Sequence, residues 1–404
     1  MYQIYIRDSN YKRIGEITEF TKLELIPRFN AVGSFVLDIP TDTMAAKELI
    51  KPKYGIIVKR DGKTLFSGTV TGRHRSFTVK GDTLTIIGKD DMKVLAETLA
   101  LPDPNGDLNS QAYDVRTGKA STIMMEYVDY NCGPKALPER RKIVLGNDVG
   151  LGNIVQGRAR FHNLIEFLSS LALKGGGLGF NVVQGENGLE FDVYQLEDKT
   201  KAAFFSPLLG NLASFEYSQN NPEANFIVVG GGGEGKERIL LTKNDNSSIA
   251  KFGRIETFVD RRDTTEVDEL HQSLDEELIN KAEQNAFLFT PIDTPQLSFG
   301  RDYNLGDKVS VVLTMPNEVV DIETIYYFIS AYQAVPVDVE RLRKVQEKFE
   351  VIQDIVREVK ITIDSNGETI IPVVGTEESN KSNILGIFDK QRKLEKRINN
   401  LERR

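Results

Sequence analysis

The stretch "GIIVKRDGKTLFSGTV" (Gly55–Val70) decides the fold class. Apolar and polar residues alternate on both sides of Asp61-Gly62, a dipeptide typical of tight hairpin turns. A period of two places alternate side chains on opposite faces of a β-sheet. The same pattern recurs through residues 1–97, with turn residues about every 8–12 positions, and indicates a barrel-like antiparallel sheet.

The length and composition describe a soluble multidomain protein. At 404 residues the chain is too long for one ordinary core, so we expect two to four domains. Hydrophobic residues make up 40% and charged residues 27%, which is typical of globular proteins. No long uncharged apolar run and no signal-peptide pattern is present, so we expect neither a membrane span nor export. The net charge of −8 argues against a dedicated nucleic-acid binder.

The predicted fold is α+β and mainly β, with two barrel-like antiparallel domains. Residues 1–97 form the first, residues 98–204 an α+β insertion, and residues 205–375 the second. In the insertion, apolar stripes predict helices over 120–131 and 161–173, and "ENGLEF" predicts a hairpin. In the second β domain, a long helix is expected at about 266–287, and strands are expected at positions that include 251–257 and 326–335.

Residues 376–404 differ from the rest and predict a polar linker followed by a C-terminal coiled-coil helix. A heptad repeat places six residues at the two core positions, with charged residues outside them. This pattern is compatible with three strands, although a helix packing on its own domain remains the alternative. The predicted oligomer interface consists of Ile384, Ile387, Gln391, Leu394, Ile398 and Leu401.

A glycine-rich stretch, "VVGGGGEGKERI" (Val228–Ile239), satisfies the spacing of a phosphate-binding loop but does not predict one. Glu237 occupies the position where Ser or Thr would bind magnesium, and a strand pattern follows where a helix should begin. We therefore interpret the stretch as a connection between two strands.

No catalytic, cofactor or metal site is predicted elsewhere. Adjacent carboxylates such as Asp90-Asp91 resemble a glycosidase pair in composition only, because neighbouring side chains on a strand point apart. The three histidines are far apart in sequence, and Cys132 is the only cysteine, which we expect to be buried.

Three segments carry a resemblance to a known family: "RFNAVGSFVLDIP" (Arg28–Pro40), "GIIVKRDGKTLFSGTV" (Gly55–Val70) and "LTIIGKDDMKVLA" (Leu84–Ala96). They resemble the opening of tail-hub proteins of long-tailed bacteriophages, which are similar in fold to the hub proteins of contractile-phage baseplates. The resemblance implies a non-enzymatic structural virion protein without cofactors.

The same resemblance implies partners and a location. The chain would form a homotrimeric ring at the tail tip, between distal tail or tail-tube proteins and a downstream tip or fibre protein. Genome DNA would pass through the ring without specific binding, and assembly would take place in the host bacterial cytoplasm. The alternatives are a cell-wall-binding or a peptidoglycan-degrading tail-tip protein.

Overall fold

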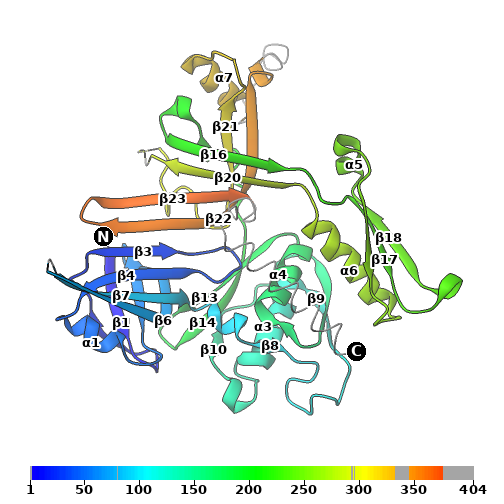
Figure 1. Ribbon diagram of the computed structural model, residues 1–404, viewed down its shortest axis with the longest axis horizontal. Helices are drawn as coiled ribbons and strands as arrows, with labels where there is room; N and C mark the ends of the chain where they lie inside the picture. Colours follow the sequence, from blue (N-terminus) through cyan, green and yellow to red (C-terminus); the bar gives the residue numbers. More distant parts are fainter. Residues whose placement is uncertain (1, 80, 293, 295, 333–344, 376–404) are drawn as a thin grey trace. The chain divides into compact units, whose positions relative to one another are not determined.

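The computed structural model describes residues 2–79, 81–292, 294, 296–332 and 345–375 (Figure 1). The chain divides into two compact units. The first consists of Met1–Ser214 and Phe289–Val373, and the second of Phe215–Leu288 and Val374–Arg404. The segment Phe215–Leu288 of the second unit is therefore inserted within the sequence of the first.

A mainly antiparallel sheet forms the centre of the first unit, with the strand order β23-β22-β3-β4-β7-β6-β5-β1-β2. Figure 1 shows its N-terminal strands in blue, with β3, β4 and β7 side by side. The N-terminal elements are β1 (Tyr2–Arg7), β2 (Arg13–Glu16), β3 (Lys22–Ile26), β4 (Ser34–Pro40), α1 (Met44–Leu49), β5 (Gly55–Arg60), β6 (Lys63–Thr78), β7 (Gly81–Asp90) and α2 (Lys93–Ala96).

Alternation along these strands produces the first core. In β3 and β4 every second residue is buried, and the residues between them are partly exposed. One face of each strand therefore removes apolar surface from water, which is the main force that stabilises a sheet on its core. The buried side chains of these two strands are Leu23, Leu25, Phe35, Leu37 and Ile39.

Strands from the end of the described chain complete the sheet. The second half of β22 pairs antiparallel with β3, so that Ile361 lies opposite Leu25. The first half of β22 pairs with β21, which also pairs parallel with β15. The elements of this part are β15 (Phe204–Phe205), η2 (Pro207–Leu209), β21 (Lys308–Thr314), α7 (Ile322–Tyr332), β22 (Phe349–Asp364) and β23 (Gly367–Gly375).

Residues 99–195 form an α+β part of the first unit with its own apolar core. The predicted helices 120–131 and 161–173 are confirmed as α3 and α4, and the Asn187-Gly188 hairpin is confirmed as β13–β14. The elements are β8 (Leu99–Ala100), β9 (Asp114–Lys119), α3 (Ala120–Cys132), η1 (Pro138–Arg140), β10 (Ile143–Leu145), β11 (Ile154–Ala159), β12 (His162–Asn163), α4 (Leu164–Lys174), β13 (Leu178–Gln184) and β14 (Leu189–Gln195).

The second unit contains a small mixed sheet covered by one helix. Strand β17 pairs antiparallel with β18 and parallel with β19, and α6 packs Leu270 and Leu274 against Ile227 and Val229. Strands β16 and β20 lead the chain into and out of this unit. The elements are β16 (Leu212–Asn220), β17 (Phe226–Gly230), η3 (Gly235–Glu237), β18 (Leu240–Asn244), α5 (Asn246–Phe252), β19 (Glu256–Asp260), α6 (Val267–Asn280) and β20 (Gln284–Pro291).

The mainly β fold with helices is confirmed, but the predicted barrels are not found. The described strands form open sheets, and the largest runs from one edge to another without closing. The alternating pattern identified the strands correctly. Closure depends on which edge strands pair, and a period of two carries no information about that pairing.

Three element assignments were wrong. Residues 326–332 belong to helix α7 and not to a strand, because a continuous apolar run does not distinguish a strand from a buried helix. Asp321 begins this helix by accepting the Thr324 backbone N–H at 2.8 Å. Residues 251–257 divide between α5 and β19 at Gly253, whose φ of +77° favours glycine. The helix expected at 266–287 ends at Asn280, and β20 follows.

The packing of β7 against β4 predicts that Gly88→Ala destabilises the first unit. A Cβ at Gly88 would overlap the Phe35 ring, which is buried, so the core would have to shift. We expect a loss of about 3 kcal/mol in the free energy of unfolding. Gly15→Ala in β2 is the control, because its Cβ would meet only Ile6 Cδ1 at 3.8 Å. Equal unfolding midpoints in urea for the two variants would contradict this packing.

Candidate functional site

A buried ion pair lies where the first strand meets the end of β7. Arg7 is 0% exposed and Asp91 2% exposed. The guanidinium donates to both carboxylate oxygens, with Nη1 and Oδ2 2.7 Å apart. Two parallel hydrogen bonds of this kind fix the orientation of both side chains. Each charge needs the other, because an unpaired buried charge is strongly destabilising.

Further hydrogen bonds extend this pair across four strands. The Ser67 hydroxyl donates to Asp91 at 2.6 Å and accepts the Gln184 backbone N–H at 2.9 Å. Arg7 also donates to Thr69 Oγ1 and to Gln184 Oε1, each at 2.9 Å. We call Arg7, Ser67, Thr69, Asp91 and Gln184 the Arg7 junction. It joins β1, β6 and the end of β7 to β13 of the α+β part.

Asp90 precedes Asp91 but has a different environment. Its Oδ2 accepts the Gly33 N–H at 2.8 Å, while Oδ1 has no hydrogen-bond partner among the described residues. Burial raises the pKa of Asp90 to about 7; the Asp91 charge adds to this rise, while Arg28 and two backbone N–H groups oppose it. The two carboxylates therefore have separate partners, as expected for neighbours in sequence, and they do not form a glycosidase pair.

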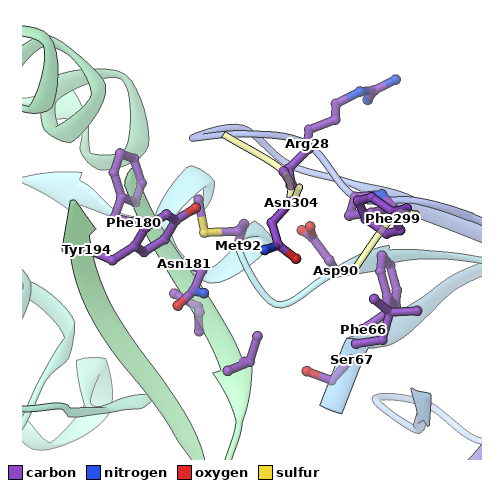
Figure 2. Close-up of a pocket in the computed structure, with 15 residues that line it drawn as sticks. Arg28, Phe66, Ser67, Asp90, Met92, Phe180, Asn181, Tyr194, Phe299 and Asn304 are labelled. Atoms are coloured by element: carbon purple, nitrogen blue, oxygen red, sulfur yellow. The ribbon is translucent and has the colours of Figure 1, made fainter. Parts of the chain in front are cut away.

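A cavity of about 370 Å³ lies beside Asp90 (Figure 2). In the close-up, Phe66 and Phe299 lie on the Asp90 side, and Phe180 and Tyr194 lie on the opposite side. The cavity lies between the first sheet, the α+β part and the segment around residue 300, all within the first unit. Its lining residues are Pro27, Arg28, Leu65, Phe66, Ser67, Asp90, Met92, Phe180, Asn181, Val182, Val183, Tyr194, Phe299, Asn304 and Leu305.

The long hairpin of β6 and β7 forms an exposed arm. The two strands pair out to Thr78 and Gly81, and the outer part of β6 is mostly exposed. Phe77 is 77% exposed and Val79 fully exposed, so the arm ends in apolar side chains. We call residues 71–79 and 81–83 the hairpin arm. An exposed, long two-stranded ribbon with an apolar tip is a typical surface for binding another protein.

A second exposed apolar surface lies at the start of α7. This helix buries Ile325 and Phe328 in the core beneath it, whereas Ile322 and Tyr326 are exposed. Val319, just before the helix, is 93% exposed. Three acidic residues accompany these side chains in the sequence, Glu318, Asp321 and Glu323. We call this set of six residues the α7 face.

The glycine-rich stretch connects two strands, as predicted. It joins the antiparallel strands β17 and β18 and contains only the three-residue 3-10 helix η3, where a phosphate-binding loop needs the start of an α-helix. A Cβ at Gly231 would lie 2.6 Å from Leu270 of α6, and Gly233 has a φ of +101°. The glycines therefore allow α6 to pack closely on the connection.

The structure also describes the single cysteine, but it does not describe the predicted coiled-coil residues. Cys132 is buried as predicted, and burial raises the pKa of its thiol to about 12, so it is not a ready nucleophile. Within the described ranges, no cluster of three or more His, Cys, Asp or Glu side chains could hold a metal. No described helix is long and apolar enough to cross a membrane. The heptad residues Ile384, Ile387, Gln391, Leu394, Ile398 and Leu401 lie outside the described residues.

The Arg7 junction was missed by sequence reasoning. The available signal was a charged residue, Arg7, ending the alternating strand that begins with Tyr2. Its partners Asp91 and Gln184 are 84 and 177 residues away. A single sequence gives no information about such pairings, so only the structure brings them together.

The fold is that of bacteriophage tail proteins, as comparison with solved structures shows. A 43 kDa tail protein of prophage MuSo2 from Shewanella oneidensis has a TM-score of 0.54 at 15% identity, covering 92% of this chain and 98% of that one. A tail protein from Neisseria meningitidis MC58 has a TM-score of 0.52 at 11% identity, with coverage of 93% and 97%. The prophage tail protein gp18 from Listeria monocytogenes EGD-e has a TM-score of 0.51 at 10% identity, with coverage of 98% and 99%.

The sequence itself identifies the family. The model of the siphovirus ReqiPepy6 Gp37-like proteins matches residues 3–340, and the chain belongs to this family. No sequence match is found among curated proteins. The predicted resemblance to phage tail proteins is therefore confirmed, and the chain is a structural component of a phage tail.

The buried ion pair predicts a large loss of stability in Arg7→Met. The substitution leaves the Asp91 carboxylate buried without its cation, which costs about 3–5 kcal/mol of unfolding free energy. Arg75→Met is the control, because the Arg75 side chain of the Arg75–Asp82 pair is 64% exposed and exposed ion pairs contribute little to stability. Replacing Asp91 by Leu as well should recover part of the loss in urea unfolding. A double variant less stable than Arg7→Met would refute this explanation.

The burial of Asp90 predicts that the free energy of unfolding depends on pH, and that Asp90→Asn removes this dependence. The folded-state pKa is about 7, above the ordinary 3.8, so the folded state holds the proton more tightly than the unfolded state. The contribution of this group to stability is full below pH 4 and falls as the pH rises to 7, by roughly 4 kcal/mol.

The test compares urea unfolding of the wild type and Asp90→Asn at pH 4.5 and pH 8. The asparagine can still accept the Gly33 N–H and carries no charge. From pH 4.5 to pH 8 the variant should become more stable relative to the wild type. If the difference in unfolding free energy between the two proteins does not change with pH, Asp90 is not buried as a carboxylic acid.

Proposed function

We propose that this chain is a tail hub, a homotrimeric structural protein at the tip of a phage tail that joins the tail tube to tip or fibre proteins. The observation that carries the proposal is the tail-protein fold, which covers nearly all of this chain and of three solved tail proteins. Family membership over residues 3–340 supports it. A ring with three-fold symmetry needs a head-to-tail contact between different surfaces of neighbouring copies.

The hairpin arm and the α7 face supply two different surfaces of suitable chemistry. Both expose apolar side chains, with Phe77 and Val79 on the arm and Val319 on the α7 face. The arm segment contains more basic than acidic residues, and the three charged residues of the α7 face are acidic. We therefore assign the contact between copies to the arm of one copy and the α7 face of the next, because opposite charges favour this pairing.

The sequence suggests the roles of the individual domains in the proposed ring. Residues 1–97 and 205–375 would be the two β domains that line the ring, with residues 98–204 as the insertion. The heptad helix within 376–404 would hold three copies together along the axis. Genome DNA would pass without specific binding, consistent with a net charge of −8. A peptidoglycan-degrading role has no support in the Asp90-Asp91 pair, whose members have separate partners.

The test is the solution mass of the full chain by light scattering across a concentration series. We expect a mass three times that of the 45.3 kDa chain. Leu394→Ser with Ile398→Ser should shift the mass towards the monomer, because serine removes apolar surface from the predicted interface. Lys393→Ser with Arg397→Ser is the matched control and should remain trimeric.

The arm contact is tested in the same measurement by Phe77→Ser with Val79→Ser. These exposed residues contribute little to folding, so a lower mass at an unchanged unfolding midpoint would assign them to assembly. A full chain that is monomeric at every concentration would contradict the proposed trimer. A heptad variant as trimeric as its control would contradict the assignment of the interface to the heptad residues.

A further inference from the structure

The cavity beside Asp90 has the features of a ligand site and not of a packing defect. Its volume of about 370 Å³ lies within the range of small-molecule sites, and its walls are mostly apolar and aromatic. An empty packing defect is normally apolar throughout, whereas this cavity has a buried carboxylate beside it. We propose that the cavity binds a small organic cation, a primary ammonium group on a short hydrocarbon chain, with Asp90 as its counter-ion.

The carboxylate geometry leaves one oxygen for a ligand. Asp90 is 9% exposed, its Oδ2 accepts the Gly33 N–H, and its Oδ1 has no hydrogen-bond partner among the described residues, although the nearby Met92 N–H favours the charged form. A buried polar atom without a partner is costly, so a donor in the cavity would be stabilising. Figure 2 shows the Asp90 carboxylate directed towards the space between the labelled side chains.

The protein's own cations do not fill this role. Arg28 lines the cavity, but its side chain extends away from Asp90 in Figure 2, and its Nε donates to Glu358 at 2.6 Å. The Arg7 guanidinium is paired with the neighbouring Asp91 and not with Asp90. The negative charge that Asp90 acquires above its pKa of about 7 therefore lacks a direct ion pair in the described part of the chain.

The walls specify the rest of the ligand. Phe66 and Phe299 lie on the Asp90 side, and together with Phe180 and Met92 they provide apolar surface for a hydrocarbon chain. The side-chain oxygen of Asn181 is also buried and without a partner among the described residues. An ammonium group has three donors and could bind the free Asp90 oxygen, while its hydrocarbon chain covers the aromatic rings.

A metal ion fits this set of residues less well. Calcium takes six to eight oxygen ligands and magnesium six, and both prefer several carboxylates or water. Here one carboxylate and two amide side chains, those of Asn181 and Asn304, face aromatic and aliphatic walls. A neutral alcohol of the same size would leave the ionised Asp90 without a counter-charge.

The experiment is calorimetric titration of the full chain with n-butylammonium chloride at pH 8, where Asp90 is largely ionised. We expect saturable binding, and binding of 1-butanol at least tenfold weaker. Asp90→Asn keeps the size of the side chain and should weaken n-butylammonium binding at least tenfold. Asp148→Asn, which alters an exposed carboxylate outside the cavity, is the matched control and should bind as the wild type does.

A second measurement remains informative if the affinity is low. The ¹³C signal of the Asp90 carboxyl, followed against pH, should show an apparent pKa lowered by at least one unit when n-butylammonium is added. No shift, equal binding of 1-butanol, or undiminished binding by Asp90→Asn would each overturn the proposal.

The ammonium group could belong to a free amine or to a lysine side chain of a second copy. Light scattering in the presence of n-butylammonium separates the two sources. An unchanged mass assigns the site to a free amine, and a lower mass for the wild type but not for Asp90→Asn assigns it to a neighbouring copy. The cavity proposal does not depend on the trimer, because binding by the wild type and not by Asp90→Asn supports it in a monomer as well.

Discussion

The interaction on which the first unit depends is the buried pair of Arg7 and Asp91. A guanidinium and a carboxylate this deep are tolerated because each neutralises the other and further hydrogen bonds replace part of the lost hydration. Ser67, Thr69 and Gln184 supply these hydrogen bonds and thereby join the first sheet to the α+β part, while Arg7 Nε has no hydrogen-bond partner among the described residues. A network of this kind holds two folded parts in one arrangement, because displacing either part leaves a buried charge without its partner.

The pairing of strands from distant parts of the sequence also holds parts of the first unit together. Strand β22 pairs with β3 across more than 300 residues, and Glu358 binds Arg28 at 2.6 Å beside that pairing. The segment Phe215–Leu288 of the second unit is inserted between two segments of the first, so the chain enters and leaves this segment through the first unit. The cavity at Asp90 lies where the first sheet, the α+β part and the segment around residue 300 meet.

Sequence reasoning succeeded where local chemistry decides the structure. The Asn187-Gly188 hairpin, the helices ending before Gly133 and Gly175, and the structural role of the glycine run were all predictable from neighbouring residues. It failed where distant contacts decide: residues 326–332 became a helix because the core beneath them accepts Ile325 and Phe328 on one face. The open edges of the sheets and the partners of Arg7 were equally inaccessible, because both depend on pairings between residues far apart in sequence.

We propose above all that this tail protein assembles as a three-fold ring. The most direct measurement is electron microscopy of the purified full chain, with class averages viewed along the particle axis. We expect closed particles of three copies, with three-fold symmetry and a central opening. Particles with two-fold symmetry, open filaments, or single copies at all concentrations would contradict it.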